Sequence, residues 1–307
     1  MKLGMVGLGR MGGNMAQRLR AHGHEVVGYD VVSEGADVTS LEELVAALPA
    51  PRIVWVMVPA GDPTEDTVAR LATLLAAGDI VIEGGNSNWR DSARRAEALG
   101  ERDVGFVDAG TSGGVWGRTE GYCLMVGGAP EHVALAQPVF DALAPEGGFV
   151  HTGAAGTGHF TKMVHNGIEY GLMQAYAEGY ELLARSGLDI DAVGALRAWR
   201  QGSVVRSWLL DLFVRALEQR PGLEGLAPVA QDSGEGRWTV QEAIDRGVAT
   251  PVISAALYAR FVSQDHEGVA MKAIAALREQ FGGHAVLPED APGEGQPPVA
   301  PADRTAT

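Results

Sequence analysis

One short stretch of the sequence holds five side chains that can transfer protons or form hydrogen bonds. They are Lys162, His165, Asn166, Glu169 and Tyr170, within a segment with the residue types of a helix. Because each residue of a helix advances by about 100°, Lys162 and Glu169 lie nearly on one face and about 10 Å apart along the axis. This spacing favours a proton-handling face on a small-molecule site. A solvated helix surface is the alternative, and helix geometry alone does not separate the two.

A second set of residues has the spacing of a dinucleotide-binding turn. Gly7, Gly9 and Gly12 fit the pattern G-x-G-x-x-G between an apolar run and an amphipathic segment. The first glycine permits the sharp turn, the second lets a pyrophosphate approach the backbone, and the third lets the helix pack on the strand. The alternative is a plain tight turn. The residues predicted to contact a cofactor here are Gly7, Leu8, Gly9, Arg10, Met11 and Gly12, with Val58 at the end of a later apolar run.

The nature of the cofactor is predicted from Asp30, which ends the next apolar run, 18 residues after Gly12. A carboxylate at this position accepts hydrogen bonds from the ribose hydroxyls of NAD and repels the 2′-phosphate of NADP. Residues 31–33 contain no arginine or lysine. We therefore predict NAD, with a strand-end turn residue as the alternative role of Asp30.

The elements that must position these groups change type near residue 155. Before it, apolar runs alternate with amphipathic segments, which predicts a doubly wound sheet of parallel strands with helices between them. Beyond it we predict only helices, over 160–186, 190–219 and 239–281, broken at 221–228 and at the glycine-rich stretch 234–236. The domains predicted are a Rossmann-type domain at 1–155, an all-helical substrate and oligomerisation domain at 156–285, and a disordered tail at 286–307.

Composition narrows the class of protein. The 307 residues carry a net charge of −15, which disfavours binding to nucleic acid or to an anionic membrane and requires a locally cationic site if the substrate is an anion. A single cysteine, Cys123, suits a reducing cytoplasm. We expect no signal peptide and no membrane span. We also expect no metal site, because the histidines lack the spacing of metal ligands. The expected location is the cytoplasm.

Several stretches together resemble the 6-phosphogluconate dehydrogenase family of the β-hydroxyacid dehydrogenase superfamily. The resemblance covers most of residues 1–284. It rests on residues 83–87 (EGGNS), 112–114 (SGG), 158–170 (GHFTKMVHNGIEY), 236–239 (GRWT) and 278–284 (REQFGGH).

The resemblance implies oxidative decarboxylation of 6-phosphogluconate to ribulose 5-phosphate, in the pentose phosphate pathway, and Asp30 makes NAD the predicted cofactor. It makes Lys162 the base at the C3 hydroxyl and later an acid, and Glu169 the acid that protonates C1 of the enediol. Among the substrate residues, Tyr170 and Arg260 hold the phosphate, while Arg278 and His284 come from a neighbouring subunit. The full implied set is Asn86, Ser112, Gly113, Gly114, His165, Asn166, Tyr170, Arg260, Arg278 and His284, with Asn86 also at the cofactor.

Departures from the family pattern lead to further expectations. The chain has about two-thirds of the length of the commoner members, whose helical domain is duplicated, so we predict a homodimer or homotetramer. Ser233 stands where the family has a lysine, and Arg237 and Arg206 are candidates to replace it. Where the family has Asn-Arg-Thr to recognise NADP, this chain has Asp-Val-Val from Asp30 onward, which supports NAD.

Two alternatives remain. Another β-hydroxyacid dehydrogenase, such as one acting on 3-hydroxyisobutyrate, shares the turn and the lysine but has no use for a phosphate site at Tyr170 and Arg260. A non-catalytic dinucleotide sensor would tolerate the loss of Lys162 or Glu169, and both are present.

Overall fold

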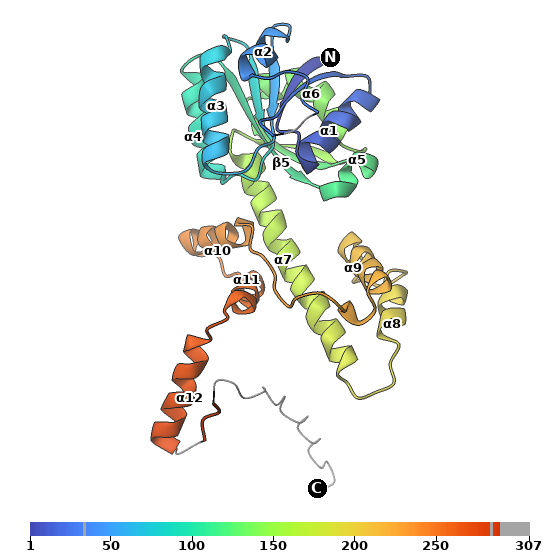
Figure 1. Ribbon diagram of the computed structural model, residues 1–307. Helices are drawn as coiled ribbons and strands as arrows, with labels where there is room; N and C mark the ends of the chain where they lie inside the picture. The colour runs from blue at the N-terminus through green and yellow to red at the C-terminus, as the bar shows by residue number, and fades with distance from the viewer. Residues whose placement is uncertain (33–34, 283–284, 289–307) are drawn as a thin grey trace.

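The chain folds into a seven-stranded sheet covered by helices, followed by a group of helices without strands (Figure 1). The computed structural model describes residues 1–32, 35–282 and 285–288. The strands are β1 (Lys2–Val6), β2 (Glu25–Tyr29), β3 (Ile53–Val56), β4 (Ile80–Glu83), β5 (Gly105–Ser112), β6 (Cys123–Gly128) and β7 (Phe149–Gly153). The helices among them are α1 (Arg10–Ala21), α2 (Leu41–Ala46), α3 (Asp62–Leu74), α4 (Trp89–Gly100), η1 (Gly114–Trp116), α5 (Gly117–Glu120) and α6 (Pro130–Leu143). The predicted fold class is confirmed.

The strand order is β2-β1-β3-β4-β5-β6-β7, so β2 and β3 lie on opposite sides of β1 and the strand order reverses there. Such a switch point opens a ligand crevice beyond the carboxyl ends of the strands. Strands β1 to β5 are parallel, as predicted, but β6 runs antiparallel to β5, and β7 follows β6. The expectation of an all-parallel sheet was wrong because only residues 113–122 join β5 to β6, and a parallel crossover needs about a dozen residues or more.

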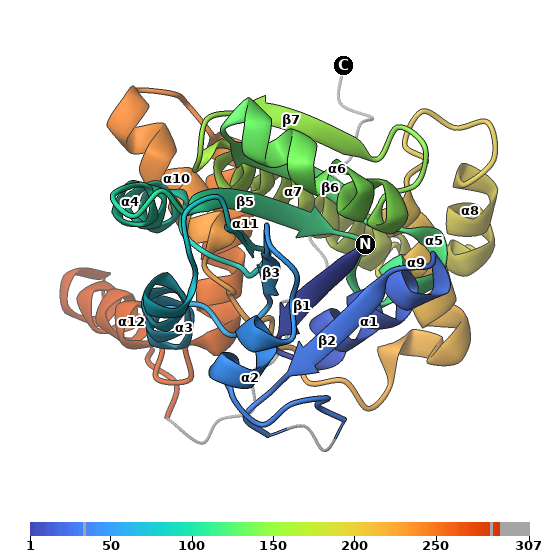
Figure 2. The same cartoon turned by 90° about the horizontal axis from the view of Figure 1, so that it is seen from above.

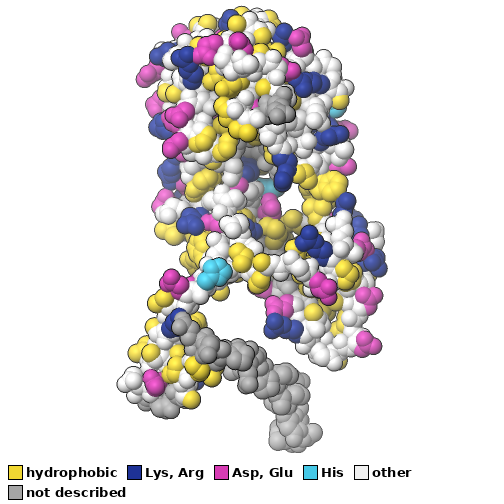
Figure 3. Space-filling view, in the orientation of Figure 1, with side chains coloured by type: hydrophobic (Ala, Val, Ile, Leu, Met, Phe, Trp, Pro, Cys, Tyr) yellow, Lys and Arg dark blue, Asp and Glu magenta, His cyan; other side chains and the backbone are white. Residues whose placement is uncertain are grey.

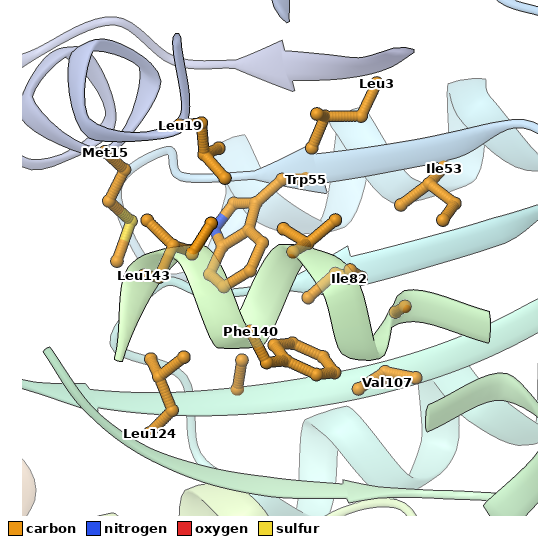
Figure 4. Close-up of a cluster of buried hydrophobic side chains, with 14 of the residues drawn as sticks. Leu3, Met15, Leu19, Ile53, Trp55, Ile82, Val107, Leu124, Phe140 and Leu143 are labelled. Carbon is orange, nitrogen blue, oxygen red and sulfur yellow. The ribbon is translucent and has the colours of Figure 1, made fainter. Parts of the chain in front are cut away.

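The sheet is buried on both faces, as Figure 2 shows from above. On one face α1 and α6 cover a cluster that includes Leu19, Trp55 and Phe140, drawn in Figure 4. On the other face α2, α3 and α4 cover a second cluster that includes Leu44 and Leu71. Every residue of β3 and β4 is buried, which explains their continuous apolar runs. Cys123, by contrast, is exposed at the start of β6.

The second part of the chain consists of α7 (Thr157–Ala184), α8 (Ala192–Trp199), α9 (Trp208–Gln219), η2 (Pro221–Leu223), α10 (Glu235–Arg246), α11 (Pro251–Gln264) and α12 (Val269–Gly282). The helix predicted over 190–219 is two helices, because Ser207 caps a new helix at Trp208. The helix predicted over 239–281 is three, since Gly247 at positive φ ends α10 and Pro251 begins α11. The stretch 234–236, predicted to separate two helices, instead forms the start of α10. Most of the tail predicted at 286–307 lies outside the described residues.

The long helix α7 is attached to the sheet by a buried carboxylate. Asp108 of β5 accepts hydrogen bonds from the backbone N–H groups of Gly156 (2.6 Å) and His159 (2.7 Å), at the start of α7. A Cβ at Gly110 would lie 2.4 Å from the Cβ of Lys162, so α7 approaches β5 as closely as a glycine allows. The sheet thereby places Lys162 at the crevice.

Candidate active site

The glycine-rich turn forms one wall of a cavity of about 510 Å³ at the carboxyl ends of β1 and β3. Gly7 has φ +92°, and a Cβ there would lie 2.3 Å from the carbonyl oxygen of Met57. A Cβ at Gly12 would lie 1.9 Å from the carbonyl oxygen of Gly7, whereas one at Gly9 would point into open space. Each glycine thus has the geometry predicted for it, and the cavity beside Gly9 fits a pyrophosphate facing the start of α1.

Asp30 lies next to this turn. Its Oδ2 accepts a hydrogen bond from the backbone N–H of Leu8 (2.6 Å), and its Oδ1 accepts one from Val32 (2.7 Å). The carboxylate is therefore held against the turn at the end of β2, where an adenosine ribose would lie. The remaining predicted cofactor residues line the cavity itself: Arg10, Met11, Val58 and Asn86.

A second cavity, of about 700 Å³, lies between the sheet and the helices that follow it. It is lined by the predicted residues Ser112, Gly113, Gly114, Lys162, His165, Asn166 and Glu169. Its other walls include apolar side chains to which the sequence assigned no role at the site, among them Trp116, Leu172, Trp208 and Leu212. Lys162 lines both cavities, so it stands where the two meet.

The amine of Lys162 is held by two acceptors from distant parts of the chain. Nζ donates to Oδ1 of Asn86 (2.6 Å) and to Oε1 of Glu235 (2.7 Å). Glu235 is 3% exposed. Burial alone would raise the pKa of this carboxyl, but the neighbouring Lys162 charge and the hydrogen bonds from Lys162 and Ser233 outweigh burial and lower it. Sequence reasoning missed Glu235 because it lies in the stretch predicted to break the helices.

His165 and Asn166 continue this network along the wall of the second cavity. Nδ2 of Asn166 donates to Oε1 of Glu235 (2.8 Å), so Oδ1 of Asn166 faces Nδ1 of His165 (3.0 Å). An amide oxygen only accepts, so Nδ1 of His165 is the donor in this contact, and Nε2 lies 3.3 Å from Ser112 Oγ. Glu169 lies 3.9 Å from the same imidazole.

Tyr170 and Arg260 form a separate group behind this cavity. The guanidinium of Arg260 lies 3.4 Å from the centre of the Tyr170 ring, and the Tyr170 hydroxyl donates to Asp232 (3.2 Å). Arg237, a candidate to replace the family lysine, is paired with Asp232 at 2.8 Å. Burial opposes ionisation of Asp232, but the Gly234 N–H and Arg237 outweigh it, so the pKa of this carboxyl is lowered. Arg237 is thus already engaged, and Arg206 is exposed.

Two residues predicted to hold the phosphate remain, Arg278 and His284. Arg278 is exposed on α12, which projects away from the sheet (Figure 1). His284 lies outside the described residues. Within residues 1–32, 35–282 and 285–288, no cluster of three or more His, Cys, Asp or Glu could hold a metal ion, and no helix has the length and apolarity needed to cross a membrane.

A dinucleotide turn, a carboxylate at the end of β2 and a lysine between two cavities are the features of a nicotinamide-dependent dehydrogenase. Residues 2–156 match the model of the NAD binding domain of 6-phosphogluconate dehydrogenase, and residues 158–291 match that of its C-terminal domain. The chain belongs to the 6-phosphogluconate dehydrogenase family, and its cofactor is NAD.

Individual relatives agree with this assignment. The Bacillus subtilis protein YqeC is 44% identical over 295 residues, which are 93% of this chain and 99% of YqeC. The NAD(+)-dependent, decarboxylating 6-phosphogluconate dehydrogenase of Haloferax volcanii is 41% identical, over 94% of this chain and all of that protein. The solved 6-phosphogluconate dehydrogenase of Plasmodium falciparum superposes with a TM-score of 0.76 at 26% identity, over 94% of this chain but 67% of that one.

Proposed function

We propose that this chain catalyses the NAD-dependent oxidative decarboxylation of 6-phosphogluconate to ribulose 5-phosphate and CO2, forming NADH. The observation that carries the proposal is the place of Lys162, which lines the cofactor and the substrate cavity at once. When bound, NAD accepts a hydride from C3 of the substrate.

The chain's own residues supply the proton transfers. Lys162 takes the proton of the C3 hydroxyl, then acts as an acid toward the C3 carbonyl oxygen while CO2 departs. The carbonyl stabilises the charge that develops on loss of CO2, and a protonated Lys162 strengthens that effect. Glu169, on the same cavity wall, gives a proton to C1 of the enediol. Asn86 orients the amine, while Ser112, Gly113, Gly114, His165 and Asn166 hold the sugar acid.

The phosphate is held by Tyr170 and Arg260, with Arg278 and His284 contributed by a second copy of the chain. The support for a homodimer or homotetramer is α12, because a helix with a long apolar surface gains stability when a second chain covers it. The exposed apolar side chains on α12 are Val269, Met271, Ile274 and Leu277, and Figure 3 shows hydrophobic surface on this helix. We place the domain boundaries at 1–155 and 156–285 and the enzyme in the cytoplasm.

The test is NADH formation from 6-phosphogluconate, 3-hydroxyisobutyrate and gluconate. We expect turnover of 6-phosphogluconate, with a ribulose 5-phosphate product. Preference for 3-hydroxyisobutyrate would indicate the other β-hydroxyacid dehydrogenase reaction, and no turnover of any substrate would indicate a sensor. Lys162→Met is expected to bind NAD but lose turnover, and Glu169→Gln to lose most product formation. Full activity of Lys162→Met would remove the base from the mechanism.

A further inference from the structure

Glu235 is a buried acidic residue that reaches the crevice from the first turn of α10. Both of its oxygens are engaged: Oε1 accepts from Lys162 Nζ (2.7 Å) and from Asn166 Nδ2 (2.8 Å), and Oε2 accepts from Ser233 Oγ (2.7 Å). It also lines the cofactor cavity beside Lys162. A carboxylate is costly to bury unless it is paired, so its place at this junction requires a physical reason.

We propose that Glu235 is the positioning and charge-setting partner of Lys162. It holds the amine between the two cavities and favours the protonated form of the lysine. The inference rests on the proposed function, in which Lys162 accepts a proton from the substrate. A base next to a fixed carboxylate binds that proton more strongly, because the ammonium that forms is paired at once.

The surroundings of Lys162 make Glu235 its main electrostatic partner. The other ionisable groups that line the two cavities are Arg10 from α1 and His165 and Glu169 from α7. The structure gives hydrogen bonds from Nζ only to Asn86 and Glu235 in the described part of the chain, and Asn86 is neutral.

Glu235 also orients the substrate cavity through Asn166. By accepting from the Asn166 amide nitrogen, it turns the amide oxygen toward Nδ1 of His165. That contact makes Nδ1 a donor and points Nε2 toward Ser112 Oγ, 3.3 Å away. A single carboxylate therefore contacts Lys162 directly and His165 through Asn166, and both of these residues line the second cavity from α7.

The first experiment reads the proton affinity of Lys162 without turnover. The sequence contains only three lysines, Lys2, Lys162 and Lys272, so brief acetylation with acetic anhydride across a pH range, followed by mass spectrometry, reports each one separately. Only the neutral amine reacts, and the other two lysines serve as internal references. In Glu235→Gln, the acetylation profile of Lys162 is expected to move to lower pH, with about tenfold or more labelling at neutral pH.

Two further variants complete the design. Glu235→Asp keeps the charge but shortens the reach, so its profile is expected between those of wild type and Glu235→Gln. The shift of Glu235→Asp from wild type remains testable if the Gln variant does not fold. Glu242→Gln is the matched control, because Glu242 is a buried carboxylate on the same helix but pairs with Arg90 and Arg246. Its Lys162 profile is expected to match wild type.

Kinetics supply the second measurement. With 6-phosphogluconate, the acid limb of the kcat/KM profile is expected to move to lower pH in Glu235→Gln, while kcat at the optimum falls because the amine is no longer held in place. An unchanged Lys162 labelling profile in both Glu235 variants would overturn the inference, as would an equal shift in Glu242→Gln. Wild-type protein without turnover would refute the proposed function alone, because the labelling still decides the role of Glu235.

Discussion

The substitution Asp108→Asn tests whether one buried carboxylate attaches the helical part of the chain to the sheet. Asp108 is fully buried, and its two oxygens accept the N–H groups of Gly156 and His159 at 2.6 and 2.7 Å. These groups belong to the start of α7, where the orphan N–H groups and the helix dipole favour a negative charge. The change is nearly isosteric, so its effect reports hydrogen bonding and charge rather than packing.

The magnitude follows from the two bonds. A hydrogen bond to a charged group contributes about 1.5–3 kcal/mol. Asparagine keeps one acceptor but turns an NH2 group toward the other backbone N–H, so one bond is lost and a donor faces a donor. The loss of the negative charge at the helix start adds about 0.3–1 kcal/mol. We expect the free energy of unfolding to fall by about 2–4 kcal/mol.

The measurement is urea unfolding followed by tryptophan fluorescence and circular dichroism, with Asp141→Asn as the control. Asp141 is exposed on α6, where it accepts from Gln137, and its substitution is expected to cost less than about 0.5 kcal/mol. We also expect kcat to fall in Asp108→Asn, because Lys162 lies on the second turn of α7. A stability within about 0.5 kcal/mol of wild type would show that packing alone attaches α7, and would refute the reasoning.

Three further predictions concern the nucleotide turn and the surface charges. Gly12→Ala is expected to abolish NAD binding, since its Cβ would lie 1.9 Å from the carbonyl oxygen of Gly7, while Gly100→Ala, with open space around it, binds normally by calorimetry. Asp30→Ala is expected to weaken NAD binding by about 10- to 100-fold, with NADP binding not weakened; an unchanged Kd for NAD would exclude the ribose contact. Hydrogen bonds from Arg94, with Arg95, lower the pKa of Glu65 from 4.5 to about 2. The stability that this pairing contributes is therefore present above pH 4.5 and lost as the pH falls toward 2, so wild type and Glu65→Gln should converge in acid unfolding curves and differ most near neutrality.

The residues whose predicted roles depend on local geometry could be recognised in the sequence. The glycine turn needs only a strand, a sharp turn and a helix in succession, so the spacing of Gly7, Gly9 and Gly12 was sufficient. Lys162 and Glu169 share a cavity wall because seven residues make nearly two turns of one helix. The positions of helix breaks were predicted less well, because the caps at Ser207 and Gly247 are single residues within otherwise continuous helical patterns.

The sequence by itself thus determined the order of elements, the glycine turn and the helix that carries Lys162 and Glu169, because periodicity and spacing are local properties of the chain. Only the tertiary structure decided what surrounds these residues. Glu235 is 73 residues from Lys162 in sequence, and Asp108 is 51 residues from His159. A buried carboxylate acquires its role from the donor that folding places against it, and neither its own residue type nor its neighbours in sequence specify that donor. The same holds for the reversed direction of β6, which depends on the short connection between Ser112 and Cys123.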